Sequence, residues 1–244
     1  MIAWDWPVFL SSLTSPAMVS GALTTILLTA TSIAAGTAIG LLAAVLRELD
    51  NGVTRFAYGA YTTIIRGTPL LVQLVFVYTG LPAIGIRFSV IQSAILALSV
   101  NEGAYLAEIM RAGIGSIHKG QMEAAQALGM TYFQAMRVVI LPQAARTVIP
   151  PIGNEVNGLL KSTSLVAVIS MEDLFRATEE LIQQSFRVLE LFTVATIYYL
   201  TITGLWTVFQ RAIEARLSIV PKPAPGRYGA MRRWFDRVAF GSGR

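Results

Sequence analysis

Long apolar segments separated by short charged ones dominate the chain, and their lengths predict membrane-spanning helices. Three stretches contain no charged residue, namely 6–46, 67–86 and 191–210. About 20 apolar residues cross the hydrocarbon core as an α-helix, so each stretch can hold a span. Together with the positions of glycine and proline, this pattern predicts five spans, over residues 17–46, 56–79, 88–110, 148–169 and 191–213.

Composition supports this interpretation. Of the 244 residues, 54% are hydrophobic and 14% are charged, and the mean hydropathy is +0.60; a soluble domain carries about 25% charged residues. The absence of cysteine excludes a disulfide framework and a thiolate nucleophile, and the single histidine, His118, lies in a polar stretch outside the spans. We therefore expect an all-α polytopic membrane protein with about five transmembrane helices.

Basic residues in the loops predict the orientation. Fourteen lysines and arginines fall on one side of the predicted spans and three on the other, and basic loops stay in the cytoplasm. The N-terminus is therefore expected outside, with Trp4 and Trp6 at the membrane surface, and the C-terminus inside. The predicted organisation is an external segment 1–16, a transmembrane domain 17–218 with a cytoplasmic loop 112–147, and a basic tail 219–244. The loop after the fourth span is acidic and is expected to form a short external helix.

The cytoplasmic loop carries the pattern of two short helices. Residues 121–128 are good helix formers, and Gly129 suits a C-cap with positive φ. Thr131 is a suitable N-cap for a second helix over 132–140, which Pro142 is expected to disrupt. A small apolar face and the charge of Glu123 would fit a groove on a partner protein. The alternative is an amphipathic loop that lies on the membrane.

The spacing within this loop is specific. The loop contains Glu123-Ala124-Ala125, three residues, Gly129, nine residues, Val139, one residue and Leu141-Pro142. This spacing resembles the signature loop of permease subunits of bacterial ABC importers, with Val139 where isoleucine is usual. Four further blocks resemble the polar amino-acid branch of that family (histidine, glutamine, arginine, glutamate or opine uptake). They are RGTPLLVQ at 66–73, GAYLAE at 103–108, GQMEAA at 120–125 and KSTSL at 161–165.

The resemblance implies a type I ABC importer transmembrane-domain fold in the bacterial cytoplasmic (inner) membrane. It also implies a homodimer or heterodimer of permeases, two ABC ATPase subunits docked on the signature loops, and an extracytoplasmic amino-acid-binding protein. The chain has no phosphate-binding loop of the Gly-x4-Gly-Lys-Ser/Thr type. ATP and Mg²⁺ are therefore expected on the partner ATPase, with no cofactor or metal here. The residues expected to couple to the ATPase are Gly120, Gln121, Glu123, Ala124, Ala125, Leu128, Gly129, Leu141 and Pro142.

Polar groups at membrane depth are candidates for a substrate pathway, because burying them in hydrocarbon is costly. Gly67-Thr68-Pro69 should kink the second span and free main-chain carbonyls. Arg66 beside it contacts substrate or serves as a structural tether to such a carbonyl or to a carboxylate, and Glu108 can pair with Arg111. The fourth span carries two polar rows, one of Asn154, Asn157 and Lys161 and one of Glu155, Gly158 and Ser162. Both cannot face lipid, so at least one lines a cavity or a subunit interface. The alternative role of the two asparagines is hydrogen bonding between subunits. The predicted pathway residues are Arg66, Thr68, Asn101, Glu102, Glu155, Asn157 and Lys161.

The predicted function is that of a permease subunit, not an enzyme, which translocates a polar amino acid by alternating access while a separate subunit hydrolyses ATP. The alternative is an ion-coupled secondary amino-acid transporter, in which Glu102 and Glu155 would bind the coupling ion. Five spans without an internal repeat fit that class poorly. An intramembrane enzyme is disfavoured because no cysteine occurs and no histidine lies in a span.

Overall fold

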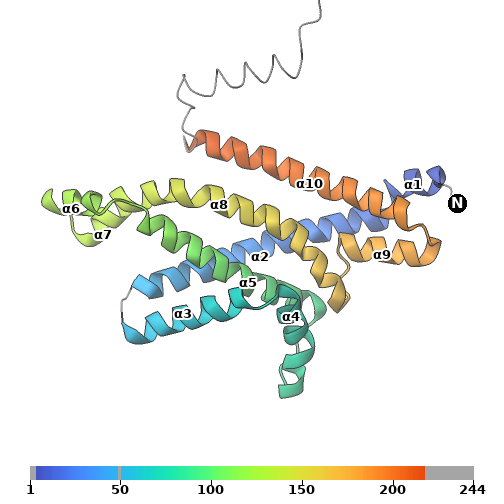
Figure 1. The fold of residues 1–244 in the computed structure, drawn as a ribbon, viewed down its shortest axis with the longest axis horizontal. Coiled ribbons are helices and arrows are strands. Elements are labelled where there is room, and N and C mark those ends of the chain that lie inside the picture. Colours follow the sequence, from blue (N-terminus) through green and yellow to red (C-terminus); the bar gives the residue numbers. More distant parts are fainter. Residues whose placement is uncertain (1–3, 49–50, 218–244) are drawn as a thin grey trace, which may run out of the picture.

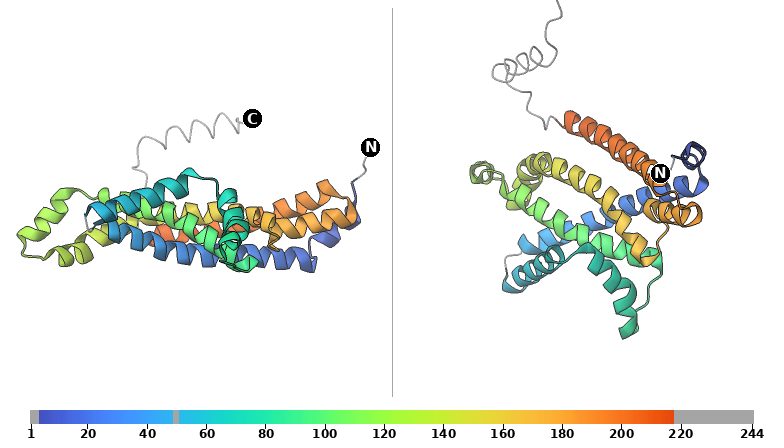
Figure 2. Two further views of the ribbon diagram at one scale, coloured as in Figure 1. Left: turned by 90° about the horizontal axis from the view of Figure 1, so that it is seen from below. Right: turned by 45° about the vertical axis from the view of Figure 1, so that its right-hand side comes forward.

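The computed structural model describes residues 4–48 and 51–217, and every regular element in those ranges is helical (Figure 1). Four long helices run along the length of the molecule: α2 (Pro16–Glu48), α5 (Val90–Gly115), α8 (Leu141–Ser162) and α10 (Val188–Arg216). The short helices α6 (Lys119–Ala127) and α7 (Tyr132–Ala135) lie at one end, and α1 (Trp6–Ser12) and α9 (Leu174–Ser185) lie at the other (Figures 1 and 2). The predicted basic tail 219–244 lies outside the described residues.

The most extensive helix contact is between α2 and α5, and it depends on two glycines spaced one helical turn apart. A Cβ atom at Gly36 would lie 2.9 Å from the Cβ of Glu102, and one at Gly40 would lie 2.9 Å from the main-chain nitrogen of Ala107. Small residues at this spacing allow two membrane helices to approach closely. Close packing of α2 fixes the position of Glu102 on α5.

The second predicted span is bent, as expected from Gly67-Thr68-Pro69. Helix α3 (Gly52–Gly67) ends there, and the chain resumes as α4 (Leu70–Val75), the π-helical turn η1 (Phe76–Gly80) and the 3₁₀ turn η2 (Leu81–Ile84). The two parts meet at 104°, and α4 points away from the long helices in Figure 1. Thr68 and Pro69 are extended at the bend, since a residue before proline avoids the helical region.

The fourth predicted span begins earlier than expected. The prediction that Pro142 disrupts the helix over 132–140 is wrong. The π-helical turn η3 (Met136–Ile140) leads directly into α8, and Pro142 lies in the first turn of α8. Proline is tolerated there because the first residues of a helix need no intrahelical N–H donor. After α8, the 3₁₀ segment η4 (Thr163–Ile169) leads toward α9.

Three of the described helices, α2, α5 and α10, are long and apolar enough to cross a membrane, and the bent pair would make a fourth span. Helix α8, the remaining predicted span, has 22 residues but is not among them. Its two polar rows lower its apolarity. Polar character on this helix is expected where it faces protein or a cavity rather than lipid.

The short helix predicted in the acidic loop after the fourth span is present as α9. The Asp173 side chain caps it by accepting a hydrogen bond of 2.9 Å from the Arg176 main-chain nitrogen. Nearby, Arg187 lies 3.1 Å from the Asp5 carboxylate, and the main-chain nitrogen of Asp5 donates to Glu190 over 2.9 Å. These contacts attach α1 to the start of α10 at the end of the molecule opposite α6 and α7.

Candidate functional site

A polar pocket of about 530 Å³ lies where the α3–α4 bend meets α5 and α8. Five of the seven predicted pathway residues line it, namely Arg66, Thr68, Asn101, Glu102 and Glu155. The other lining residues are Gly67, Pro69, Leu70, Tyr105, Gly158, Leu159, Ser162 and Leu165. The pocket therefore combines one guanidinium and two carboxylates with amide and hydroxyl groups, and these polar groups come from α3, the α3–α4 bend, α5 and α8.

Gln73 stabilises the α3–α4 bend, although the sequence alone did not indicate it as a site residue. Its Nε2 donates to the main-chain carbonyl of Ile65 over 2.8 Å and to the Thr68 hydroxyl over 2.8 Å. Its Oε1 accepts a 3.1 Å hydrogen bond from Asn101 Nδ2. The sequence signal for this role is an amide side chain four residues after Pro69. Because proline has no N–H, the last turn of α3 lacks a main-chain donor, and the amide replaces it. Gln73 thus joins the bend to α5 at the wall of the pocket.

The two acidic residues of the pocket have different surroundings. Glu102 is 6% exposed, and its Oε2 has no hydrogen-bond partner among the described residues. Glu155 is half-buried and belongs to the polar row of α8 that includes Gly158 and Ser162, all three of which line the pocket. A buried carboxylate without a partner is costly. Glu102 is therefore suited to accept a hydrogen bond from a molecule bound in the pocket.

The remaining predicted pathway residues lie elsewhere. Asn157 Nδ2 donates to the Thr207 hydroxyl on α10 over 3.4 Å, and on the same row Asn154 accepts from Gln210 over 3.3 Å. Lys161 is exposed and does not line the pocket. This row of α8 packs toward α10, so its amides join helices within one subunit, an arrangement that neither of the expected roles included.

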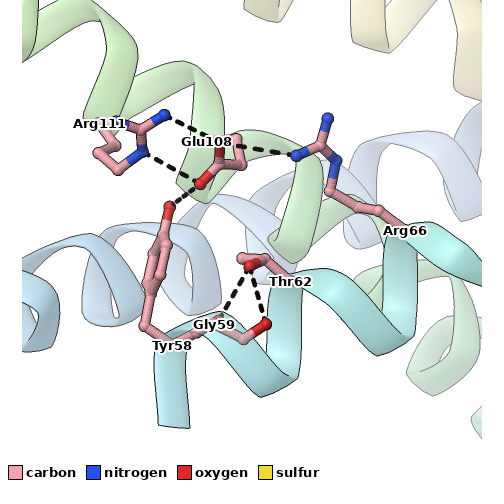
Figure 3. Close-up of polar contacts among 6 residues, drawn as sticks. All are labelled: Tyr58, Gly59, Thr62, Arg66, Glu108 and Arg111. Atoms are coloured by element: carbon pink, nitrogen blue, oxygen red, sulfur yellow. Dashed lines mark hydrogen bonds and ion pairs between the residues drawn. The ribbon is translucent and has the colours of Figure 1, made fainter. Parts of the chain in front are cut away.

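Arg66, which lines the pocket, and Arg111, which does not, approach the same carboxylate, that of Glu108 (Figure 3). Arg111 forms the predicted pair with Glu108 through two hydrogen bonds of 3.1 Å. Arg66 NH1 lies 3.6 Å from Glu108 Oε2, and its guanidinium lies 5.2 Å from the centre of the Tyr105 ring. The Tyr58 hydroxyl also donates to Glu108. Arg66 is therefore tethered to a carboxylate and lines the pocket at the same time.

The signature loop folds largely as predicted. Gly129 has a φ of +82° and ends α6, and Thr131 forms a capping box with Gln134 at the start of α7. Helix α7 and the π-helical turn η3 together cover the predicted second helix, 132–140, and the chain then continues into α8 without a break. His118, the single histidine, caps α6 by accepting from the Gly120 main-chain nitrogen over 3.1 Å.

The predicted coupling residues differ in exposure. Ala125 is 3% exposed, because it packs against its own chain, whereas Leu128 is 81% exposed. Gln121 accepts a 3.2 Å hydrogen bond from Gln143, which joins α6 to the start of α8. Among the other predicted coupling residues, Gly120 is half-buried. The exposed ones are Glu123, Ala124, Gly129, Leu141 and Pro142. The exposed residues of the loop thus include the carboxylate of Glu123 and the apolar side chain of Leu128.

No metal centre accompanies these sites within residues 4–48 and 51–217, where no three histidine or acidic side chains lie together in an arrangement that could hold an ion.

Comparison with known proteins assigns the chain to a family. Residues 36–219 match the family of binding-protein-dependent transport system inner membrane components. The chain is 36% identical over 219 residues to the glutamine transport system permease protein GlnP of Escherichia coli (strain K12), covering 89% of this chain and 99% of that protein. It is 38% identical over 223 residues to the L-cystine transport system permease protein TcyB of Bacillus subtilis (strain 168), covering 88% and 92%.

A solved structure of an amino acid ABC transporter with histidines gives the same result. It superposes with a TM-score of 0.83 at 34% identity, over 88% of this chain and 100% of that chain. The chain therefore belongs to the family of binding-protein-dependent transport system inner membrane components. It is an ABC importer permease with the type I fold, a multi-pass membrane subunit rather than an enzyme, and in this family ATP hydrolysis belongs to a separate subunit.

Proposed function

We propose that this permease carries a polar α-amino acid into the cell through the pocket at the α3–α4 bend. The observation that supports this proposal is the presence of Arg66 and Glu155 on the wall of one 530 Å³ pocket. An α-amino acid is a zwitterion. It requires an anionic partner for its ammonium group and a cationic or donor partner for its carboxylate.

Four polar groups of the pocket have a role in this proposal. Glu155 binds the ammonium group, and Arg66 binds the carboxylate with donors that can engage both oxygens. Asn101, held by Gln73, and the Thr68 hydroxyl offer further hydrogen bonds at the bend. The relatives named for glutamine and cystine transport support a polar side chain on the substrate.

Energy input is proposed to come through the signature loop. Two ATPase subunits bearing ATP and Mg²⁺ would dock on the α6–α7 segments of two permeases, with the exposed Glu123 and Leu128 on the contact surface. An amino-acid-binding protein would deliver the substrate at the opposite end, near α1 and α9. Closure of the ATPase dimer would move α6 and rock the spans so that the pocket opens alternately to each side.

The basic residues support an orientation with the N-terminus outside and the loop 112–147 inside, because fourteen of them fall on the side of that loop. The position of α6 and α7 at one end of the molecule and of α1 and α9 at the other is consistent with this orientation.

The test is uptake by proteoliposomes that contain the permease with its ATPase, supplied with the binding protein. We expect uptake of a labelled polar amino acid only with ATP and Mg²⁺ on the ATPase side. Uptake driven by a proton or sodium gradient alone would instead support the ion-coupled alternative, in which Glu102 and Glu155 bind the ion.

A further inference from the structure

Glu108 on α5 is shared by two arginines from different parts of the fold (Figure 3). Arg111, one helical turn away, takes both of its oxygens at 3.1 Å, and the Tyr58 hydroxyl from α3 adds a third donor. Arg66, from the end of α3, lies 3.6 Å from Oε2. One carboxylate cannot neutralise two guanidinium groups, so this cluster keeps a net positive charge.

Arg66 is the less strongly bound of the two arginines. Its contact with Glu108 is longer, at 3.6 Å against 3.1 Å for Arg111, and one face of its guanidinium lies over the Tyr105 ring. A guanidinium group has five N–H donors. Arg66 therefore has capacity for a second anion, and the pocket that it lines is where that anion would be.

Two other carboxylates line the same pocket, those of Glu102 and Glu155. Either would attract the Arg66 guanidinium if nothing held it back, because opposite charges attract strongly where water is scarce. An Arg66–Glu155 pair would cancel the charges that a zwitterion needs. Glu108 does not line the pocket, and its contact with Arg66 competes with that pairing.

We propose that Glu108 is a positioning residue that keeps the Arg66 guanidinium apart from the pocket carboxylates, so that it binds the carboxylate of the transported amino acid. This proposal rests on the proposed function of the pocket. Glu108 does not touch the substrate. Arg111 and Tyr58 hold Glu108 in place, and Glu108 holds Arg66.

The test measures direct binding to the permease–ATPase complex in nanodiscs, without the binding protein. The wild-type complex is first screened with the twenty common L-amino acids and L-cystine. The amino acid that binds most tightly and its α-amide, which lacks the negative charge, are then the two probes. Glu108→Gln is compared with Arg66→Gln and with the double variant.

We expect Glu108→Gln to weaken binding of the amino acid about three- to fivefold, as for loss of a partly exposed charge contact, and to change binding of the amide less than about twofold. In the Arg66→Gln background, Glu108→Gln should have no further effect on the acid-to-amide ratio, because its role acts through Arg66. Glu180→Gln on α9, which removes a carboxylate 3.0 Å from Arg176, is the matched control and should leave both probes unchanged.

Two results would overturn the proposal. Equal weakening of acid and amide by Glu108→Gln would indicate a structural role, and the same loss with and without Arg66 would exclude action through it. If Glu108→Gln does not assemble, Glu108→Asp replaces it, and the same selective but smaller loss is required. A wild-type complex that binds none of the amino acids would refute the proposed function itself, an outcome that differs from a failure seen only in the variants.

Discussion

The side-chain nitrogen of Gln73 donates a hydrogen bond of 2.8 Å to the main-chain carbonyl of Ile65. Ile65 lies in the last turn of α3, where carbonyls have no intrahelical partner, and Pro69 four residues later has no N–H. Gln73 therefore satisfies the helix end and, through Asn101, connects it to α5. The bend that forms one wall of the pocket is stabilised by this single amide.

Replacing Gln73 by leucine should destabilise the bend. The change leaves the Ile65 carbonyl and the Asn101 amide without their partner, at a cost of about 1–3 kcal/mol. Thermal unfolding of the purified complex measures it. Gln184→Leu, at an exposed position of α9, is the control and should have little effect. Equal melting temperatures for Gln73→Leu and wild type would show that the bend does not depend on Gln73.

The signature loop is tested by two substitutions of different kinds. Gly129→Val opposes a φ of +82° and should cost about 1–2 kcal/mol in the turn. Glu123→Lys reverses an exposed charge and leaves the fold intact. Both should reduce co-purification of the ATPase and uptake, while insertion of the permease in the membrane persists. If both variants keep the ATPase and wild-type uptake, the loop does not couple the two subunits.

The orientation is tested by cysteines placed in this cysteine-free chain. Ser11, Ser116 and Gln184 are exposed and lie on the two sides that the basic residues predict. An impermeant thiol reagent on intact cells should label Ser11→Cys and Gln184→Cys but not Ser116→Cys. Ser12 is an unsuitable site because it is buried. Labelling of Ser116→Cys before permeabilisation would reverse the assigned orientation.

Asp173 predicts a pH dependence at the end that carries α9. Burial raises the pKa of Asp173 to about 6 from its ordinary value of 3.8, so the folded protein favours the protonated form. Its stability should therefore be greatest below about pH 4 and fall, by roughly 3 kcal/mol, as the pH rises to about 6. Asp173→Asn keeps an oxygen to cap α9 without the charge.

The measurement for Asp173 is the melting temperature of both proteins between pH 4.5 and 7.5. Wild type should lose stability relative to Asp173→Asn as the pH rises to about 6, with no further divergence above it. Parallel curves across the range would contradict the raised pKa.

The sequence predicted the class of fold, the bend at residues 67–69, the Gly129 turn and the Thr131 cap, because these depend on local chemistry. It also identified five residues that line one pocket. It missed the start of α8, because Pro142 can interrupt a helix or begin one, and the outcome depends on the preceding turn. It placed Asn157 and Lys161 in the pathway because spacing assigns residues to a face of α8, whereas packing of α10 decides what each face contacts.

The role of Gln73 was not predicted, and the tether of Arg66 to a carboxylate was one expectation that did not name Glu108, for a related reason. Both join residues that are distant in the sequence: Gln73 contacts Asn101 on α5, and Arg66 reaches Glu108 across the α3–α5 contact. A single sequence shows periodicity within a helix but not which faces of two helices meet. The Gly36 and Gly40 pair was a signal for close packing of α2, although it does not name the partner helix.

The substitution Glu155→Gln tests most directly whether the pocket at the α3–α4 bend binds the transported amino acid. Glu155→Gln preserves shape and removes the proposed partner of the substrate ammonium group. ATP-dependent uptake and ATP hydrolysis are measured together on reconstituted complexes. We predict that uptake falls at least about tenfold, as for loss of a half-buried charge contact, while the complex assembles and hydrolyses ATP as wild type does. Unchanged uptake, or loss of assembly in its place, would contradict a substrate site in this pocket.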